Sequence, residues 1–220
     1  MNAKSVSDYL IRSPCNFTEN EFVYWDNIIP KINGIDINLQ SHITIITCDI
    51  TQLNVDIIVN PANKDGLGCF NVDHKCLDNV IHRKSGPRLR NACRNLLLGH
   101  KLQVAQPIIT CAFKLPCKYV IHVVGPNAHE DSTLDFDILV MCYINSIELA
   151  RKINCKTIAF PCISTGLFGY PCDISAQKVF NGVSQYLYNK KINDIQIVFV
   201  CWDKINYSHY LNASKVHTNS

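Results

Sequence analysis

The stretch Ala159–Pro171, with the sequence AFPCISTGLFGYP, leads from an apolar run through a loop with two glycines into a helical pattern. The earlier stretch Val55–Cys69, VDIIVNPANKDGLGC, has the same order. Glycine lets main-chain N–H groups approach an anion, because no Cβ stands in the way. Two such loops facing each other could hold a diphosphate from both sides. Either loop alone is a weak signal, since an ordinary strand-to-helix turn has the same composition.

Six short apolar runs rich in β-branched residues predict six strands. Continuous apolar runs are typical of strands that are buried on both faces of a sheet. The runs are Ile43–Cys48, Val55–Asn60, Pro107–Ala112, Tyr119–Val124, Thr157–Phe160 and Ile195–Cys201.

Helical patterns lie between several of these runs. The alternation predicts an α/β fold with three layers (α/β/α) and a mixed, largely parallel central sheet. In such folds ligands bind at the carboxyl ends of the strands. We therefore expect the chemistry in the loops that follow Val59 and Phe160. The predicted helices are His74–Lys84, Pro87–Leu98, Leu134–Lys152 and Ile174–Tyr188.

The length of 220 residues fits one domain with a substantial core. Hydrophobic residues make up 47% of the chain and charged residues 18%, which indicates a globular protein and not a disordered one. We expect residues 41–220 to form the domain. Residues 1–40 are irregular and polar-aromatic, and we expect an N-terminal extension that packs on the domain, with a short helix at about Glu19–Ile29.

Composition argues against membrane and nucleic-acid partners. The longest apolar runs, such as Ile195–Val200, fall far short of the roughly 20 residues that span a bilayer. The N-terminus has no apolar core of signal-peptide length. A net charge of +3 is too small to indicate nucleic-acid binding. The most basic segment, His82–Arg94, is interpreted as a solvated helix face, with contact to RNA as a minor alternative.

Twelve cysteines point to a reducing compartment. Most of them lie inside apolar strand or helix patterns, where cysteine behaves as a small hydrophobe. No C-x-x-C pair occurs, which argues against thioredoxin-like redox chemistry. We expect a cytoplasmic protein with few or no disulfides.

Five motifs in a fixed order resemble those of the macrodomain family, the ADP-ribose-binding module. They are Cys48–Thr51 (CDIT), Val55–Asn63 (VDIIVNPAN), Asp78–His82 (DNVIH), Lys118–Pro126 (KYVIHVVGP) and Ala159–Pro171 (AFPCISTGLFGYP). The resemblance runs from about Ile43 to about Trp202, and it implies the three-layer fold predicted above.

The resemblance also implies an ADP-ribose site. Asp49 matches the acidic residue that accepts from the adenine amino group, and Ile50 would offer its main-chain N–H to the ring. Asn63 matches the asparagine that holds the distal ribose. Trp202 is a candidate for covering adenine, with a packing role as the alternative. The matching phosphate loop contains Ser164, Thr165, Gly166, Leu167 and Phe168, of which Phe168 would pack on the distal ribose.

Two histidines in the family segments, His82 and His122, are assigned structural roles. A histidine inside an apolar strand such as YVIHVVGP is more often a hydrogen-bonded core residue than an acid or a base.

The segment after the first loop, Asn60–Cys69, differs from the corresponding segment of the hydrolytic macrodomains that carry a run of glycines there. It is about five residues longer and contains Cys69, His74 and Cys76 in the spacing C-x4-H-x-C. Two thiols and an imidazole are good zinc ligands, and three protein ligands leave a position open to water or substrate. The segment resembles the zinc-containing branch of the family. A fourth ligand, for which Cys162 and Cys172 are candidates, would make the site structural instead.

The resemblance to this branch implies a zinc-dependent hydrolase that removes mono-ADP-ribose from modified proteins. Asn63 would position the ribose, and Asp78 would act as a base or as an orienting partner. Counting without gaps would place Asp73 there instead, but the following N-V-I-H favours Asp78. The resemblance favours esters of acidic side chains. The alternatives are a reader that binds ADP-ribose without turnover and a deacetylase of O-acetyl-ADP-ribose.

Overall fold

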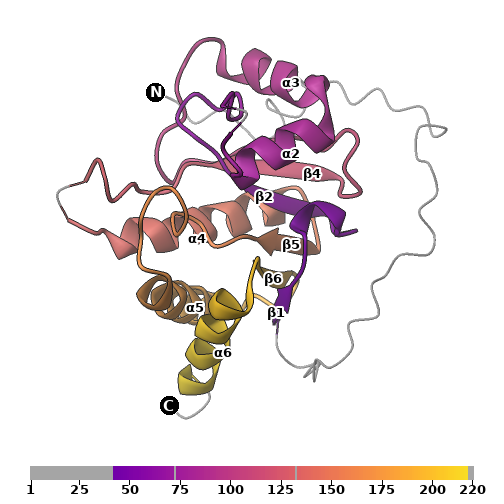
Figure 1. Ribbon diagram of the computed structural model, residues 1–220. Helices are drawn as coiled ribbons and strands as arrows, with labels where there is room; N and C mark the ends of the chain where they lie inside the picture. Colours follow the sequence, from indigo (N-terminus) through magenta and orange to yellow (C-terminus); the bar gives the residue numbers. More distant parts are fainter. Residues whose placement is uncertain (1–41, 72, 132, 218–220) are drawn as a thin grey trace.

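Six strands form one sheet in the computed structural model, which describes residues 42–71, 73–131 and 133–217 (Figure 1). Each predicted strand is present, with its ends shifted by at most two residues. The predicted helix at Glu19–Ile29 and the predicted packing of residues 1–40 lie outside the described residues. The strands are β1 (Ile43–Thr47), β2 (Ile57–Pro61), β3 (Ile108–Cys111), β4 (Tyr119–Val123), β5 (Thr157–Phe160) and β6 (Gln196–Cys201).

The sheet has the order β1-β6-β5-β2-β4-β3. Strand β3 pairs antiparallel with β4, and all other neighbours in the sheet pair in parallel. This confirms the mixed, largely parallel sheet. Because β2 lies between β5 and β4, the loops that follow these three strands leave the sheet at the same edge.

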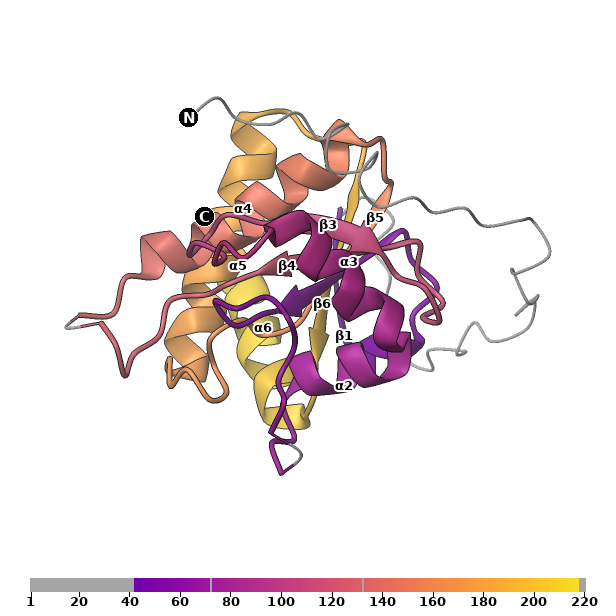
Figure 2. The same cartoon turned by 90° about the horizontal axis from the view of Figure 1, so that it is seen from above.

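Helices cover both faces of the sheet (Figures 1 and 2). Successive side chains of β2 point to opposite faces. Ile58 packs in one cluster with Ile81 of α2, whereas Ile57 packs in the other with Ile147 of α4. The three predicted layers are therefore confirmed. The helices are η2 (Ile50–Gln52, a 3-10 turn), α2 (Leu77–Ser85), α3 (Pro87–Leu97), α4 (Phe136–Lys152), α5 (Cys172–Asn189) and α6 (Lys204–His217).

Local sequence signals set the ends of α3 and α4. The carboxylate of Asp135 accepts a hydrogen bond from the main-chain N–H of Ile138 at 2.9 Å and so caps α4. Arg151 and Lys152 lie in the last turn of α4, where the helix dipole favours positive charge. Pro87 opens α3, a position where its missing N–H is no loss. These signals explain why both helices start close to their predicted positions.

Helix α6 is an element that the sequence patterns did not predict. The carboxylate of Asp203 accepts from the main-chain N–H of Asn206 at 2.7 Å, which caps the helix. Tyr210 and Ala213 are buried in the cluster that includes α5, and they are the only buried side chains among the described ones of α6. A helix with so few buried positions gives only a weak 3.6-residue periodicity of apolar side chains in the sequence. The capping residue Asp203 is its clearest local signal.

No described helix combines the length and the apolar character that a membrane span requires. In the described part, ten cysteines are free, and Cys111 is disulfide-bonded. Most of the described cysteines thus carry thiols, as expected from their placement in apolar elements.

Gly125, directly after β4, lies against the loop that follows β5. A Cβ at this position would be 2.1 Å from Oγ of Ser164 and 2.6 Å from Cγ2 of Ile163. Ser164 is itself buried, with a φ of 65°, in a backbone region that non-glycine residues occupy uncommonly. The absence of a side chain at Gly125 therefore lets the two loops meet.

Gly125→Ala should destabilise the fold by about 1–3 kcal/mol, because the new methyl group overlaps Ser164 and Ile163. Gly166→Ala is the matched control, since no atom lies within 4 Å of its added Cβ. The free energy of unfolding from denaturant titration measures both changes. Equal stability of the two variants would contradict the close approach at Gly125.

Candidate functional site

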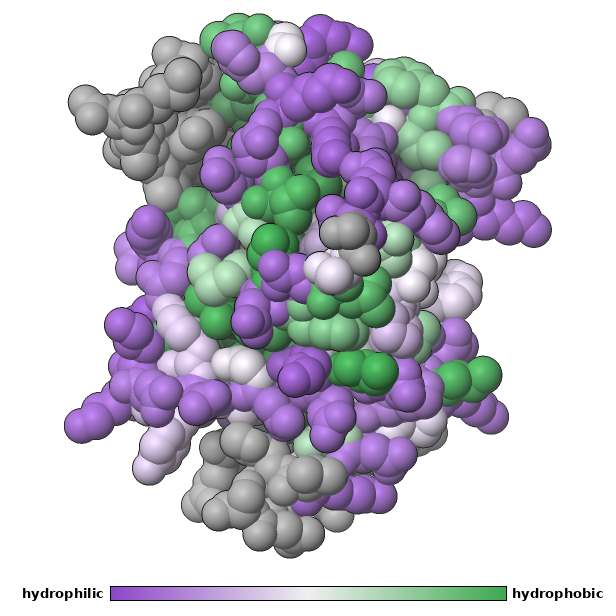
Figure 3. Space-filling model, turned by 90° about the vertical axis from the view of Figure 1, so that its left-hand side faces the viewer, coloured by the Kyte–Doolittle hydropathy of each residue, from purple (hydrophilic) through white to green (hydrophobic). Residues whose placement is uncertain are grey.

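One groove, with a volume of about 1280 Å³, is lined by the loops that follow β1, β2, β5 and β6. Figure 3 shows apolar side chains gathered near the middle of one side of the molecule, with hydrophilic ones around them. The structure brings all the predicted site residues together in this groove. They are Asp49, Ile50, Asn63, Cys69, His74, Cys76, Asp78, Ser164, Thr165, Gly166, Leu167, Phe168 and Trp202.

Asn63 closes the first loop on itself. Its Oδ1 accepts from the main-chain N–H of Gly66 at 3.0 Å, and its Nδ2 donates to the carbonyl oxygen of Gly68 at 3.3 Å. The main-chain N–H of Gly66 also donates to the carbonyl oxygen of Asn63 at 3.0 Å. The amide of Asn63 is therefore presented to the groove from a hydrogen-bonded turn.

The rest of the first loop is supported from α2 and α3. Gly68 has a φ of 81°, and a Cβ there would be 2.6 Å from Cγ of His82, so only glycine fits. Arg90 donates from Nε to the carbonyl oxygen of Leu67 at 2.7 Å, and its guanidinium lies 4.3 Å from the ring centroid of Phe70. This corrects the interpretation of the basic segment as a solvated face for Arg90 alone, which is partly buried and holds the loop. The other basic residues of the segment are exposed, as predicted; they are Arg83, Lys84, Arg88 and Arg94.

Asp78 lies beneath Asn63 at the start of α2. Its Oδ1 accepts from Nδ2 of Asn60 at 2.8 Å, and its Oδ2 lies 3.4 Å from Nδ2 of Asn63. Burial raises the pKa of Asp78 to about 6, although the hydrogen bond from Asn60 and the charge of Arg90 lower it. Asp73, by contrast, is exposed. Among the described residues, Asp78 is thus the acid that the fold places beside Asn63.

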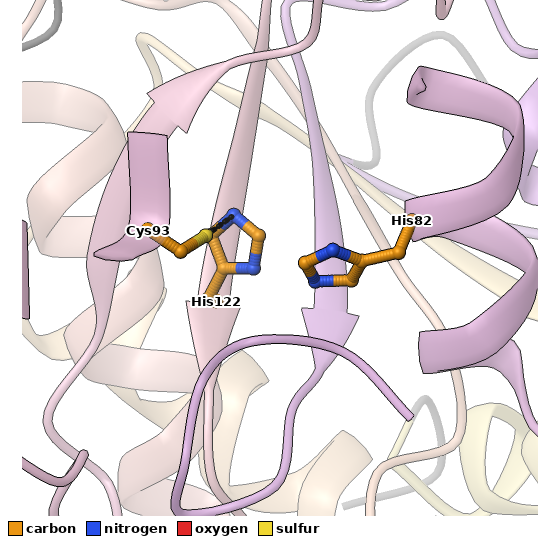
Figure 4. A group of neighbouring side chains, drawn as sticks. All are labelled: His82, Cys93 and His122. Carbon is orange, nitrogen blue, oxygen red and sulfur yellow. Dashed lines mark hydrogen bonds between the residues drawn. The ribbon is translucent and has the colours of Figure 1, made fainter. Parts of the chain in front are cut away.

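His82 and His122 form a buried cluster with Cys93 behind the first loop (Figure 4). Nδ1 of His122 lies 3.1 Å from Nδ2 of Asn60, and its Nε2 lies 3.0 Å from Oγ1 of Thr110. Desolvation lowers the pKa of His82 to about 4 and that of His122 well below its usual value, so both rings are neutral at pH 7. Neither ring lines the groove. The hydrogen bonds of His122 fit a structural role, whereas neither ring nitrogen of His82 has a hydrogen-bond partner among the described residues.

Cys69, His74 and Cys76 all line the groove, and all three are at least partly exposed. Sγ of Cys69 lies 3.6 Å from Nδ1 of His74. A sulfur and a nitrogen ligand on one tetrahedral zinc ion would lie ~3.6 Å apart, given their usual bond lengths. Burial, and then the neighbouring thiol of Cys69, raise the pKa of the Cys76 thiol. The types of donor, and the separation of Cys69 from His74, fit a zinc ion that would displace these protons.

The set of Cys69, His74 and Cys76 is looser than a closed metal site. In the part of the chain that the structure describes, His82, Cys93 and His122 form the group whose donor atoms all lie within 4.8 Å of one another. His74 lies in the loop, because α2 begins at Leu77 and not at His74 as predicted. Its position on a loop leaves it free to adjust to an ion.

The two candidates for a fourth ligand have other partners beside the second loop. A contact with Cys201, and to a smaller extent burial, raise the pKa of the Cys162 thiol. Sγ of Cys172 lies 3.8 Å from the carbonyl oxygen of Thr165. Both candidate sulfurs therefore have partners other than Cys69, His74 and Cys76.

The second loop, which follows β5 and includes Ser164–Tyr170, presents main-chain N–H groups to the groove. The hydrogen bonds that close it come from Gly169, Tyr170 and the hydroxyl of Thr165. Among the described residues, none of these bonds uses the N–H groups of Gly166, Leu167 or Phe168. Such unpaired N–H groups are suited to the oxygens of a phosphate.

At another part of the groove, Asp49 caps η2 by accepting from the main-chain N–H of Thr51 at 3.0 Å. Lys84 of α2 also reaches the carboxylate of Asp49, with Nζ 2.6 Å from Oδ2. Trp202 lines the groove with 78% of its surface exposed, so its ring is available to a ligand and is not a packing residue of the core.

Several residues that build the site were not predicted from the sequence. Asn60 and Arg90 act from behind the loop, while Asn127 lines the groove after β4. The partners of Asn60 and Arg90 are distant in the sequence, so no local spacing pointed to these two residues. The first asparagine of the segment NPAN was a readable signal, because a polar residue at the end of a buried strand needs a buried partner.

Comparison with known proteins identifies a family model, relatives and solved structures that are similar to this chain. The family model described as "Macro domain" matches residues 59–179. A protein named "Protein-ADP-ribose hydrolase" from Staphylococcus aureus (strain MRSA252) is 40% identical over 156 residues, which cover 69% of this chain and 58% of that protein. The chain thus spans little more than half the length of this curated relative.

Two solved structures share the fold. The macrodomain of Oceanobacillus iheyensis with ADP has 35% sequence identity and a TM-score of 0.71, covering 80% of this chain and 90% of that one. The Trypanosoma brucei macrodomain in complex with ADP-ribose has 30% identity and a TM-score of 0.65, covering 80% and 69%. On the match of the family model and these similarities, the chain belongs to the Macro domain family.

Proposed function

We propose that this protein is a zinc-dependent hydrolase that removes mono-ADP-ribose from modified proteins. The observation that carries the proposal is the position of Cys69, His74 and Cys76 in the same groove as Asn63 and the second glycine loop. A set of metal ligands away from the groove would have suggested a structural ion. The name of the Staphylococcus aureus relative and the ADP-ribose complex of the Trypanosoma brucei macrodomain support the substrate class.

Cys69, His74 and Cys76 would hold the zinc ion. A zinc ion bound by three protein ligands supplies a Lewis acid that polarises a hydroxyl group or lowers the pKa of bound water. The bond that breaks joins the distal ribose to the protein side chain, and water supplies the hydroxyl group and the proton that the two products gain.

The side chains of this protein position the substrate. The N–H groups of Gly166, Leu167 and Phe168 would bind the diphosphate, and Phe168 would pack on the distal ribose. Asn63 would hold a ribose hydroxyl with its amide, which the turn at Gly66 orients. Asp78 would fix Asn63 from below, and with a pKa of about 6 its carboxylate is also suited to accept a proton near neutral pH.

The acceptor is proposed to be an ester of an aspartate or glutamate side chain, since that linkage is the one implied by the zinc-containing branch. We also propose that the protein acts in the cytoplasm, because most described cysteines are free thiols. A reader module without turnover would share the groove and differ only at the metal ligands. A deacetylase of O-acetyl-ADP-ribose would use the same site on a smaller ester.

Cys76→Ala should lower the turnover of a mono-ADP-ribosylated protein by about a hundredfold or more, because one zinc ligand is lost. The affinity for free ADP-ribose should fall much less. Release of ADP-ribose measures the turnover, and calorimetry measures the affinity. Elemental analysis measures the metal content. Cys172→Ala is the matched control and should keep both the metal and the turnover. Normal turnover by Cys76→Ala, or after chelation of the metal, would rule out the zinc-dependent reaction.

Asp78→Asn should lower kcat by about tenfold or more, since the carboxylate beneath Asn63 is replaced by a neutral amide. Asp73→Asn should change kcat by less than about twofold, because Asp73 is exposed and contributes no described contact to Asn63. Steady-state kinetics on the same modified protein give both values. A larger loss in Asp73→Asn than in Asp78→Asn would reverse the assignment.

A further inference from the structure

Lys84, in the last turn of α2, forms an ion pair with Asp49. Its Nζ lies 2.6 Å from Oδ2 of Asp49 and 2.7 Å from Oγ1 of Thr51. The two partners belong to the segment that follows β1, more than thirty residues away in the sequence. Lys84 does not line the groove, but Asp49 does. Lys84 therefore acts on the groove through Asp49.

We propose that Lys84 is a positioning residue that determines base specificity. It holds the carboxylate of Asp49 as a fixed hydrogen-bond acceptor for the exocyclic amino group of adenine. The groove would then prefer adenine to a purine that carries an oxygen at the same position. This inference rests on the proposed function, because it takes the groove as the site of ADP-ribose.

The hydrogen bonds of Asp49 show why Lys84 is needed. Oδ1 accepts from the main-chain N–H and the hydroxyl of Thr51, and both bonds belong to the local turn. Oδ2 accepts from Lys84 at 2.6 Å and from Nε2 of Gln52 only at 3.3 Å. Lys84 is thus the short contact that fixes Oδ2. An ionised carboxylate has about four acceptor positions, so a ligand donor can take the place of the long contact to Gln52.

Charge supports the same conclusion. Partial burial by itself would raise the pKa of Asp49, but the hydrogen bonds from Lys84 and Thr51 and the charge of Lys84 outweigh it, and the pKa is lowered. The carboxylate of Asp49 is therefore ionised and can only accept hydrogen bonds. An amino group on the base can donate a hydrogen bond to this carboxylate. A carbonyl oxygen in the same place cannot donate one, so two hydrogen-bond acceptors would face each other without a hydrogen between them.

The test compares two ligands on the 220-residue chain and on three variants of it. The ligands are ADP-ribose and the analogue in which hypoxanthine replaces adenine, and calorimetry gives their dissociation constants. The variants are Lys84→Ala, Lys84→Arg and Arg83→Ala. Arg83 is the matched control, since it is exposed on the same helix turn and has no described partner. Thermal unfolding checks that all variants are folded.

Lys84→Ala should weaken ADP-ribose binding by about three- to tenfold and leave the analogue nearly unchanged, so the preference for adenine falls by the same factor. Lys84→Arg should retain most of the preference, and Arg83→Ala all of it. Equal preference in the wild type and in a folded Lys84→Ala variant would overturn the inference and leave the proposed function intact. Failure of the wild type to bind ADP-ribose would overturn both.

Discussion

Parallel pairing of β2 with β5 on one side and β4 on the other is the constraint on which the site depends. Strands that run in the same direction end at the same edge of the sheet, so the loops after them must meet there. The contact between Gly125 and Ser164 then fixes how closely two of these loops approach. Without this pairing, Asn63 and the N–H groups around Gly166 would lie on separate surfaces, and no local sequence pattern could bring them to one ligand.

A buried polar network connects the sheet to the groove. His122 on β4 contacts Asn60 at the end of β2, Asn60 donates to Asp78, and Asp78 lies beside Asn63. Buried polar groups are tolerated when they are hydrogen-bonded to one another, and such networks make a single arrangement of the core favourable. The neutral histidine and the raised pKa of Asp78 have the same origin, which is exclusion of water from behind the first loop. The network therefore serves to orient Asn63 without placing a net positive charge beneath it.

The fold could be predicted because the inner strands are buried on both faces and so appear as continuous apolar runs, although β1 is only partly buried. The residues expected to bind adenine and the phosphates could also be predicted, since they lie in motifs that follow strands, whereas Asn127 in the same groove was not predicted. The sequence did not reveal α6, whose buried side chains among the described ones are only Tyr210 and Ala213. It also gave no sign that Arg90 supports the first loop or that Lys84 reaches Asp49, because both contacts join residues far apart in the chain. Charge patterns alone cannot separate a solvated helix face from one that holds a loop.

The central claim is that a metal ion at Cys69, His74 and Cys76 lies beside the distal ribose of a bound ADP-ribose. Crystals of the protein with ADP-ribose, measured on both sides of the zinc absorption edge, test it directly. The account predicts one anomalous peak that is coordinated by these three side chains and close to the distal ribose, with adenine beside Asp49. The contradicting result is density for ADP-ribose in the groove with no anomalous peak at the three residues, in crystals of protein that contains zinc. That result would favour a module that binds ADP-ribose without turnover.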